Sequence, residues 1–251
     1  MLSSVERQQR TVVDRPLCLV PGLLWMINGE FPHRTDAGGF AVETPHHLVV
    51  FDAGSGKNTP RVEANLDQLG GRARKIVHIA THNHLDHVGG VMPLVEHGYG
   101  SEVWTPESHL SSQPTGDATA SDLYDVRFPG VRVDRTLYDN EVLQFGDVRI
   151  HVVSTPGHAP DHACYFISWR GNLIGIFGDI DGGHSERLGS DLEQRSRSIA
   201  RLTDVREFTY VEGHGGLSQP LRPRFEFVQK MRRCGERLQP GFGYLFDPMH
   251  R

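Results

Sequence analysis

The sequence predicts an α/β protein, because short apolar runs rich in β-forming residues alternate along the chain with segments of helical character. The composition agrees with a globular chain, since 37% of the 251 residues are hydrophobic and 23% are charged. In addition, polar residues follow directly on several of the predicted strands, where loops usually carry chemistry. We therefore expect a single domain over residues 1–251 with its functional groups at strand ends.

The first half of the chain supplies two buried strands and two helices. Residues 48–51 form an apolar run that ends at Asp52, and residues 75–80 form a second run that leads into His82. Between them, Thr59 followed by Pro60 predicts an N-cap with proline at the first helical position, so we expect a helix over residues 60–69. Residues 93–97 predict a short helix that ends before a glycine.

The second half of the chain repeats the alternation. Residues 148–154, 173–177 and 208–211 predict strands, and the residues just beyond them include His158, Asp179 and His214. Residues 190–193 (SDLE) form a capping box that predicts a helix to about residue 202, and residues 224–237 predict a final amphipathic helix. Because strand ends of one sheet system lie close together, we expect these polar residues to meet.

Charge and apolar patterning limit the partners. The formal net charge is −5 and the pI is about 6.3, so no basic surface favours a nucleic acid. The apolar stretch at residues 17–27 is too short to cross a bilayer. Arginines precede it as in a signal peptide, but Glu6 and Asp14 do too, and no small-residue cleavage site follows. These observations predict a cytoplasmic protein, a monomer or homodimer, with a small-molecule substrate and neither nucleic acid nor membrane as partner. The aperiodic residues 107–134 fit a lid over a substrate and an ordinary surface loop equally well.

The strongest local signal is the sequence THNHLDHVGG at residues 81–90, which places three histidines and one aspartate within six residues. Such groups are costly to bury without partners. As metal ligands they can serve together, with His82 and His84 on one cation and Asp86 and His87 on a second. Imidazole and carboxylate ligands suit Zn²⁺, and Fe or Mn is also compatible.

This segment resembles the HxHxDH motif of the metallo-β-lactamase superfamily, and the rest of that family's pattern follows in order. Asp52 comes after an early strand, and His158 lies in a TPGH sequence. Asp179 follows Phe-Gly, and His214 lies between glycines. The match spans roughly residues 38–216, which we take as the motif-bearing core. The resemblance implies a four-layer αββα sandwich of two mixed sheets flanked by helices, with a dinuclear metal site along one edge.

The resemblance also implies a ligand set and two catalytic residues. One metal ion takes His82, His84 and His158, the other takes Asp86, His87 and His214, and Asp179 bridges them. Asp86 and Asp179 are the expected catalytic residues, and Asp52 orients the ligand loop without being a ligand. His162 is a candidate supporting residue, and Asp181 and His184 are candidates to line the pocket. We expect His78 to be packed, and the remaining histidines to be structural or superficial (His33, His46, His47, His97, His109, His151 and His250).

Two divalent cations sharing a water can lower its pKa and polarise a substrate oxygen, which predicts hydrolysis by a metal-bridging hydroxide. The compact chain resembles the lactonase, thioesterase and organophosphate-hydrolase branch, so a small ester, lactone or thioester is the expected substrate. The alternatives are a phosphoester or phosphotriester hydrolase with the same site, a mononuclear-iron persulfide dioxygenase and a non-catalytic scaffold. No tyrosine follows Asp179 closely, whereas acyl-homoserine lactonases commonly carry one there.

Overall fold

The computed structural model describes residues 15–29, 36–107, 119–124, 126, 128, 130–215 and 220–233. Within these ranges the strands form two mixed sheets, one of seven strands in the order β1-β2-β3-β4-β5-β6-β7 and one of six in the order β13-β12-β11-β10-β9-β8. The strands of the first sheet are β1 Leu17–Val20, β2 Leu24–Met26, β3 Phe40–Glu43, β4 His47–Phe51, β5 Lys75–Ile79, β6 Glu102–Pro106 and β7 Arg135–Leu137. Those of the second sheet are β8 Val142–Phe145, β9 Val148–Ser154, β10 Ala163–Trp169, β11 Asn172–Ile176, β12 Thr209–Val211 and β13 Arg222–Pro223.

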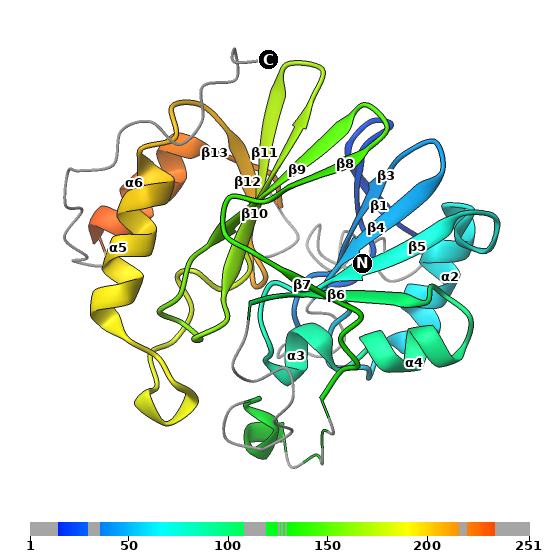
Figure 1. Cartoon of the computed structure of the whole chain (residues 1–251), viewed down its shortest axis with the longest axis horizontal. Helices are drawn as coiled ribbons and strands as arrows, with labels where there is room; N and C mark the ends of the chain where they lie inside the picture. The colour runs from blue at the N-terminus through cyan, green and yellow to red at the C-terminus, as the bar shows by residue number, and fades with distance from the viewer. Residues whose placement is uncertain are drawn as a thin grey trace, which may run out of the picture.

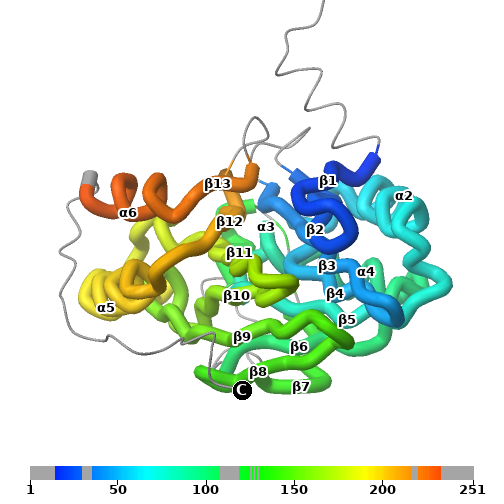
Figure 2. The backbone as a smooth tube through the Cα atoms, turned by 90° about the horizontal axis from the view of Figure 1, so that it is seen from above, coloured from blue at the N-terminus to red at the C-terminus, as the bar shows by residue number. Residues whose placement is uncertain are grey.

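Helices cover the outer face of each sheet and complete an αββα sandwich. Figure 1 shows α2 and α4 outside the first sheet and α5 and α6 outside the second, and Figure 2 shows the same two halves from above. The α-helices are α2 Thr59–Gln68, α3 Leu85–Val88, α4 Val91–Glu96, α5 Leu192–Thr203 and α6 Arg224–Arg233. Short 3₁₀ turns are η1 Gly71–Ala73, η2 Ser121–Tyr124 and η3 Glu186–Leu188. The predicted fold class is therefore confirmed.

The central core lies between the two sheets, where apolar side chains from both inner faces interdigitate. The rings of Phe51 and Tyr165 meet there at 5.0 Å between centroids. The Tyr165 hydroxyl donates to the Ala80 carbonyl at 2.7 Å, so the second sheet is bonded to the end of β5, directly before the metal-ligand motif.

Two outer cores fasten the helices to the sheets. One packs α2, α3 and α4 against the first sheet, and the other packs α5 and α6 against the second. In the latter, the Phe177 ring stacks on Tyr210 at 5.2 Å and meets the Phe227 ring of α6 at 5.1 Å. Because Phe177 is two residues before Asp179, this aromatic cluster fixes the strand end that carries the predicted bridging carboxylate.

The predicted strands and helices are present within one or two residues of their expected ends, but two helix caps differ. The N-cap of α2 is Asn58, not Thr59, whose side chain donates to the Gly56 carbonyl instead. The N-cap of α5 is Asp191, which accepts from the backbone of Glu193 and Gln194, whereas Ser190 donates to the His158 carbonyl. In each case the hydroxyl has a loop carbonyl within reach, and another residue takes the capping position.

The C-terminal helix begins at residue 224 as predicted and is described to residue 233, so its expected continuation to residue 237 lies outside the described residues. His33, His250 and residues 108–118, which include His109, lie outside them as well. In the part of the chain that the structure describes, no helix is both long and apolar enough to cross a membrane.

Gly157 sits where the TPGH loop meets α5, and its replacement by alanine is expected to be strongly destabilising. Its φ is +138°, and a Cβ atom there would lie 2.3 Å from backbone atoms of Arg195. Overpacking and backbone strain together are expected to cost about 3 kcal/mol of unfolding free energy. The melting temperature should fall by roughly 6–12 °C, measured by thermal unfolding of the G157A variant.

Gly171→Ala is the matched control, because Gly171 also has a positive φ, +80°, but no atom lies within 4 Å of its added Cβ. It isolates the backbone strain, expected to cost about 1 kcal/mol. Equal decreases in the melting temperature of the two variants would contradict the close packing of α5 on the TPGH loop.

Candidate metal centre

The sandwich brings the predicted site residues to one edge, from both sheets. Asp52 follows β4 and His82 follows β5 in the first sheet, while His158, Asp179 and His214 follow β9, β11 and β12 in the second. The neighbouring strands β4 and β5 are parallel, as are β11 and β12, so their carboxyl ends point the same way. This arrangement explains how residues 82 to 214 meet.

His82, His84 and His158 form the first triad. The His84 Nδ1 atom lies 3.0 Å from His82 Nε2 and 3.1 Å from His158 Nε2, and the ligand atoms of the triad all lie within 4.8 Å of one another. All three side chains are buried. Three ring nitrogens thus converge on one point, which is the arrangement that a cation requires.

Asp86, His87 and His214 form the second triad, again with ligand atoms within 4.8 Å of one another. His214 Nε2 lies 3.1 Å from Asp86 Oδ2 and 3.5 Å from Asp179 Oδ2. Asp179 also lies 3.8 Å from His158 Nε2 and 3.3 Å from His87 Nε2, so its carboxylate faces both triads. All seven predicted ligands are therefore in one cluster, and Asp179 is at its centre.

Hydrogen bonds on the outer side of the imidazoles fix which nitrogen faces the cluster. His87 Nδ1 donates to Asp52 Oδ2 at 2.8 Å, and His158 Nδ1 donates to the Gly183 carbonyl at 3.0 Å. Asp52 also accepts from the Thr81 backbone N–H and hydroxyl, both at 2.8 Å. Metal-binding histidines typically use their second N–H in this way, and Asp52 acts as the predicted loop-orienting residue.

The electrostatics of the two triads differ. Burial and the neighbouring His158 lower the pKa of His84 to about 3, and burial with the surrounding imidazoles places the pKa of His82 well below its ordinary value. These rings are neutral at physiological pH, the form that binds metal. Burial opposes a charge on His87 as well, but the carboxylates of Asp179 and Asp52 outweigh it and raise the pKa of His87.

The donor set fits a pair of divalent cations. His87 Nε2 is fully buried and, among the described residues, has no partner with hydrogen-bond geometry. It faces Asp179 and Asp86, and an orphaned buried nitrogen beside two carboxylates indicates a place for positive charge. Five imidazoles with two carboxylates are ligands typical of zinc, and of iron and manganese.

Gly213 is required for the close approach of the last ligand loop. A Cβ atom on Gly213 would lie 2.5 Å from Asp179 Oδ1 and 2.6 Å from the His87 ring. Its N–H donates to the Gly178 carbonyl at 2.8 Å, which ties the loop carrying His214 to the loop carrying Asp179.

The other candidate residues have distinct positions. His162 is buried, accepts from the Asp179 backbone N–H at 3.1 Å and contacts the Thr155 hydroxyl at 2.8 Å, which is the predicted supporting role. Asp181 forms an ion pair with Lys230 of α6, and His184 is exposed. His78 is buried as predicted and contacts the Tyr99 carbonyl.

Lys230 joins α6 to two of the three ligand loops of the second sheet, those that carry Asp179 and His214. Besides Asp181, its Nζ contacts Glu212 at 3.0 and 3.1 Å from the two carboxylate oxygens, and Arg222 lies 3.4 Å from the same buried carboxylate. No sequence pattern predicts this network, because its members are far apart along the chain and match no motif. Tyr124 was missed for the same reason.

The hydroxyl of Tyr124, at the end of η2, is hydrogen-bonded to the Asp86 carboxylate. Burial and that carboxylate raise the pKa of Tyr124. The residue belongs to the aperiodic segment 107–134, in which no regular spacing separates a functional side chain from an ordinary loop residue. Only the folded structure shows that it reaches the site.

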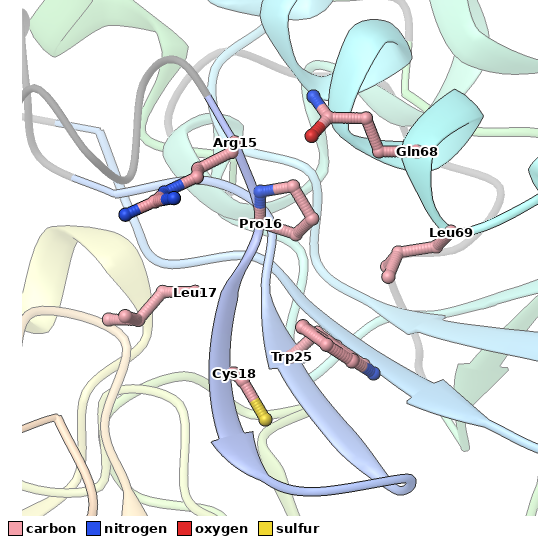
Figure 3. Close-up of a pocket in the computed structure, with 7 residues that line it drawn as sticks. All are labelled: Arg15, Pro16, Leu17, Cys18, Trp25, Gln68 and Leu69. Carbon is pink, nitrogen blue, oxygen red and sulfur yellow. The ribbon is translucent and has the colours of Figure 1, made fainter.

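A separate pocket of about 490 Å³ lies at the outer edge of the first sheet, and Figure 3 shows the side chains that line it. They come from β1 and the two residues before it, from β2, and from the end of α2 and the residue after it: Arg15, Pro16, Leu17, Cys18, Trp25, Gln68 and Leu69. None of the predicted ligands is among them. The ligand geometry, rather than this cavity, therefore identifies the functional site.

An αββα sandwich with a His/Asp cluster at the edge of its two sheets defines a family of metal-binding proteins, and the chain belongs to it. Residues 40–206 match the family model described as the metallo-beta-lactamase superfamily. A metallo-β-lactamase structure from Cronobacter sakazakii superposes with a TM-score of 0.69 over 93% of this chain and 87% of that one, at 23% identity. This likeness shows the fold.

Curated relatives are similar over part of their length. A hydroxyacylglutathione hydrolase of Rhizobium etli is 32% identical over 133 residues, 53% of this chain and 43% of the relative. An atrochrysone carboxyl ACP thioesterase of Passalora fulva is 24% identical over 200 residues, 77% of this chain and 53% of the relative. The chain thus spans about half the length of these curated relatives.

Proposed function

We propose that the protein is a dinuclear-metal hydrolase that cleaves a small ester, lactone or thioester. The observation that carries this proposal is the convergence of two ligand triads on one carboxylate, Asp179. Two related proteins, a hydroxyacylglutathione hydrolase and an acyl carrier protein thioesterase, support a thioester or ester as the substrate class. Zinc is the proposed metal.

The cations, when bound by the two triads, would supply a Lewis acid and lower the pKa of a bound water. The remaining chemistry belongs to the chain. Asp179 orients His87, His158 and His214 toward a common centre. Asp86 would hold a proton and pass it to the leaving group, and the 3.1 Å between its Oδ2 atom and His214 Nε2 supports this role.

The test is a hydrolysis screen of the zinc-loaded protein over lactones, thioesters, aryl esters and phosphoesters, with metal content measured on the same sample. We expect about two Zn per chain, with turnover of acyl substrates that exceeds turnover of phosphoesters. Removal of the metal by a chelator should abolish the activity, and added zinc should restore it.

Two results would contradict the proposal. Preferential cleavage of phosphoesters would reassign the substrate class at the same site. One Fe per chain with thiol-dependent oxygen uptake would replace hydrolysis by the chemistry of a persulfide dioxygenase.

A further inference from the structure

The segment containing residues 119–124 is fastened directly to the metal-ligand helix α3. The Leu85 backbone N–H donates to the Thr119 carbonyl at 2.8 Å, and the Leu123 N–H donates to the Ala120 carbonyl at 2.9 Å. Thr119, Ala120 and Ser121 are buried. Although this segment lies outside every family motif in the sequence, it is thus held at a fixed place beside Asp86.

Its backbone is constrained further at Ala120, whose φ is +57°. A left-handed conformation costs an alanine about 1 kcal/mol and persists only where the surroundings hold it. The turn that follows directs Tyr124 toward the cluster. Its ring packs on the outer core of the first sheet, and its hydroxyl bonds to the Asp86 carboxylate.

Three imidazoles of the cluster already have their outer N–H groups engaged. The outer N–H groups of His82, His87 and His158 are directed to Thr81, Asp52 and Gly183, respectively. The two carboxylates of the cluster accept hydrogen bonds. A phenol keeps its proton at neutral pH, so the Tyr124 hydroxyl is a donor there, and its O–H can rotate from Asp86 to another acceptor beside it.

We propose that Tyr124 donates a hydrogen bond to the substrate oxygen on which negative charge develops during hydrolysis. This role rests on the proposed hydrolase function and adds to it a residue from segment 119–124. A donor already held in place at the position of the developing charge stabilises the transition state more than the bound substrate.

The experiment compares Tyr124→Phe with Tyr99→Phe in the zinc-loaded protein. Tyr99 is the matched control, because its hydroxyl accepts from Arg72 near the amino end of β6, whereas the metal cluster lies at carboxyl strand ends. Steady-state kinetics on an acyl substrate found in the screen are combined with calorimetric binding of a phosphonate analogue, whose oxygens imitate the developing charge. Metal content and melting temperature are recorded for each variant.

For Tyr124→Phe we expect kcat/KM to fall about 100-fold, mainly through kcat, and the phosphonate Kd to rise about 10-fold or more. Metal content should stay unchanged, and Tyr99→Phe should match the wild type in kcat/KM and Kd. Loss of metal from Tyr124→Phe would overturn the inference and indicate that the phenol supports Asp86 instead. An unchanged phosphonate Kd would also overturn the inference, but it would leave the proposed hydrolase function standing. A zinc-loaded wild type inactive on every substrate would overturn the proposed function and this inference together.

Discussion

Replacement of Asp179 by asparagine is expected to lower kcat/KM by about 10³-fold or more. The carboxylate lies 3.3 to 3.8 Å from three imidazoles, which come from both triads. Burial opposes its ionisation, but His87, His214 and His158 outweigh that effect and hold the pKa of Asp179 below its ordinary value. Because it is charged over the whole working range, its loss removes several kcal/mol of metal-based transition-state stabilisation.

Metal analysis and kinetics check this prediction on one preparation. The D179N variant should retain fewer than two metal ions per chain while its secondary structure, measured by circular dichroism, stays intact. His184→Ala is the control, since His184 is exposed in the same loop and should leave both readouts unchanged. If D179N kept full metal content and activity, the assignment of this carboxylate to the centre of the site would be wrong.

Replacement of Asp52 by asparagine is expected to weaken metal binding by about 10–100-fold, although Asp52 is not a predicted ligand. Both oxygens of its carboxylate accept hydrogen bonds, from the Thr81 backbone N–H and hydroxyl and from His87 Nδ1. Asparagine replaces one of these oxygens by an NH₂ group, which would face a hydrogen-bond donor instead of accepting from it. The backbone of Asp52 has a φ of +54°. Asparagine tolerates that conformation well, so the effect reports the lost charge rather than backbone strain.

Competition with a chromophoric zinc chelator measures the affinity of the Asp52 variant. Asp36→Asn is the matched control, because Asp36 is also a buried carboxylate that accepts from Asn28 and Asn58, yet it bonds to none of the seven predicted ligands. An equal loss of zinc affinity in both variants would indicate a general effect of a buried charge and would contradict the specific role of Asp52.

The strands and the metal cluster could be predicted because both are local patterns. The residues HNHLDH lie within six positions, and each later ligand follows an apolar run that predicts a strand. Parallel strands then bring Asp52 and His82 together, as they do Asp179 and His214. The strand ends therefore predicted that these residues meet, and the family resemblance supplied the set of seven ligands that the structure brings into one cluster.

The contacts that sequence reasoning missed join residues far apart in the chain. Lys230 lies 18 residues from Glu212 and 49 from Asp181, and neither separation belongs to a helical or strand repeat. Tyr124 reaches Asp86 through a turn with an alanine in a left-handed conformation, which no propensity predicts. The caps at Asn58 and Asp191 depended on which loop carbonyls lay near Thr59 and Ser190.

The division of the ligands between the two sheets has a thermodynamic consequence. His82, His84, Asp86 and His87 belong to the first half of the sandwich, whereas His158, Asp179 and His214 belong to the second. An ion held by both sets is a cross-link between the halves, in addition to the bond from Tyr165 to Ala80. At a free concentration 100 times its Kd, such an ion adds about 2.7 kcal/mol to the stability of the folded chain. Metal supply would then set how long the protein survives as well as how fast it works.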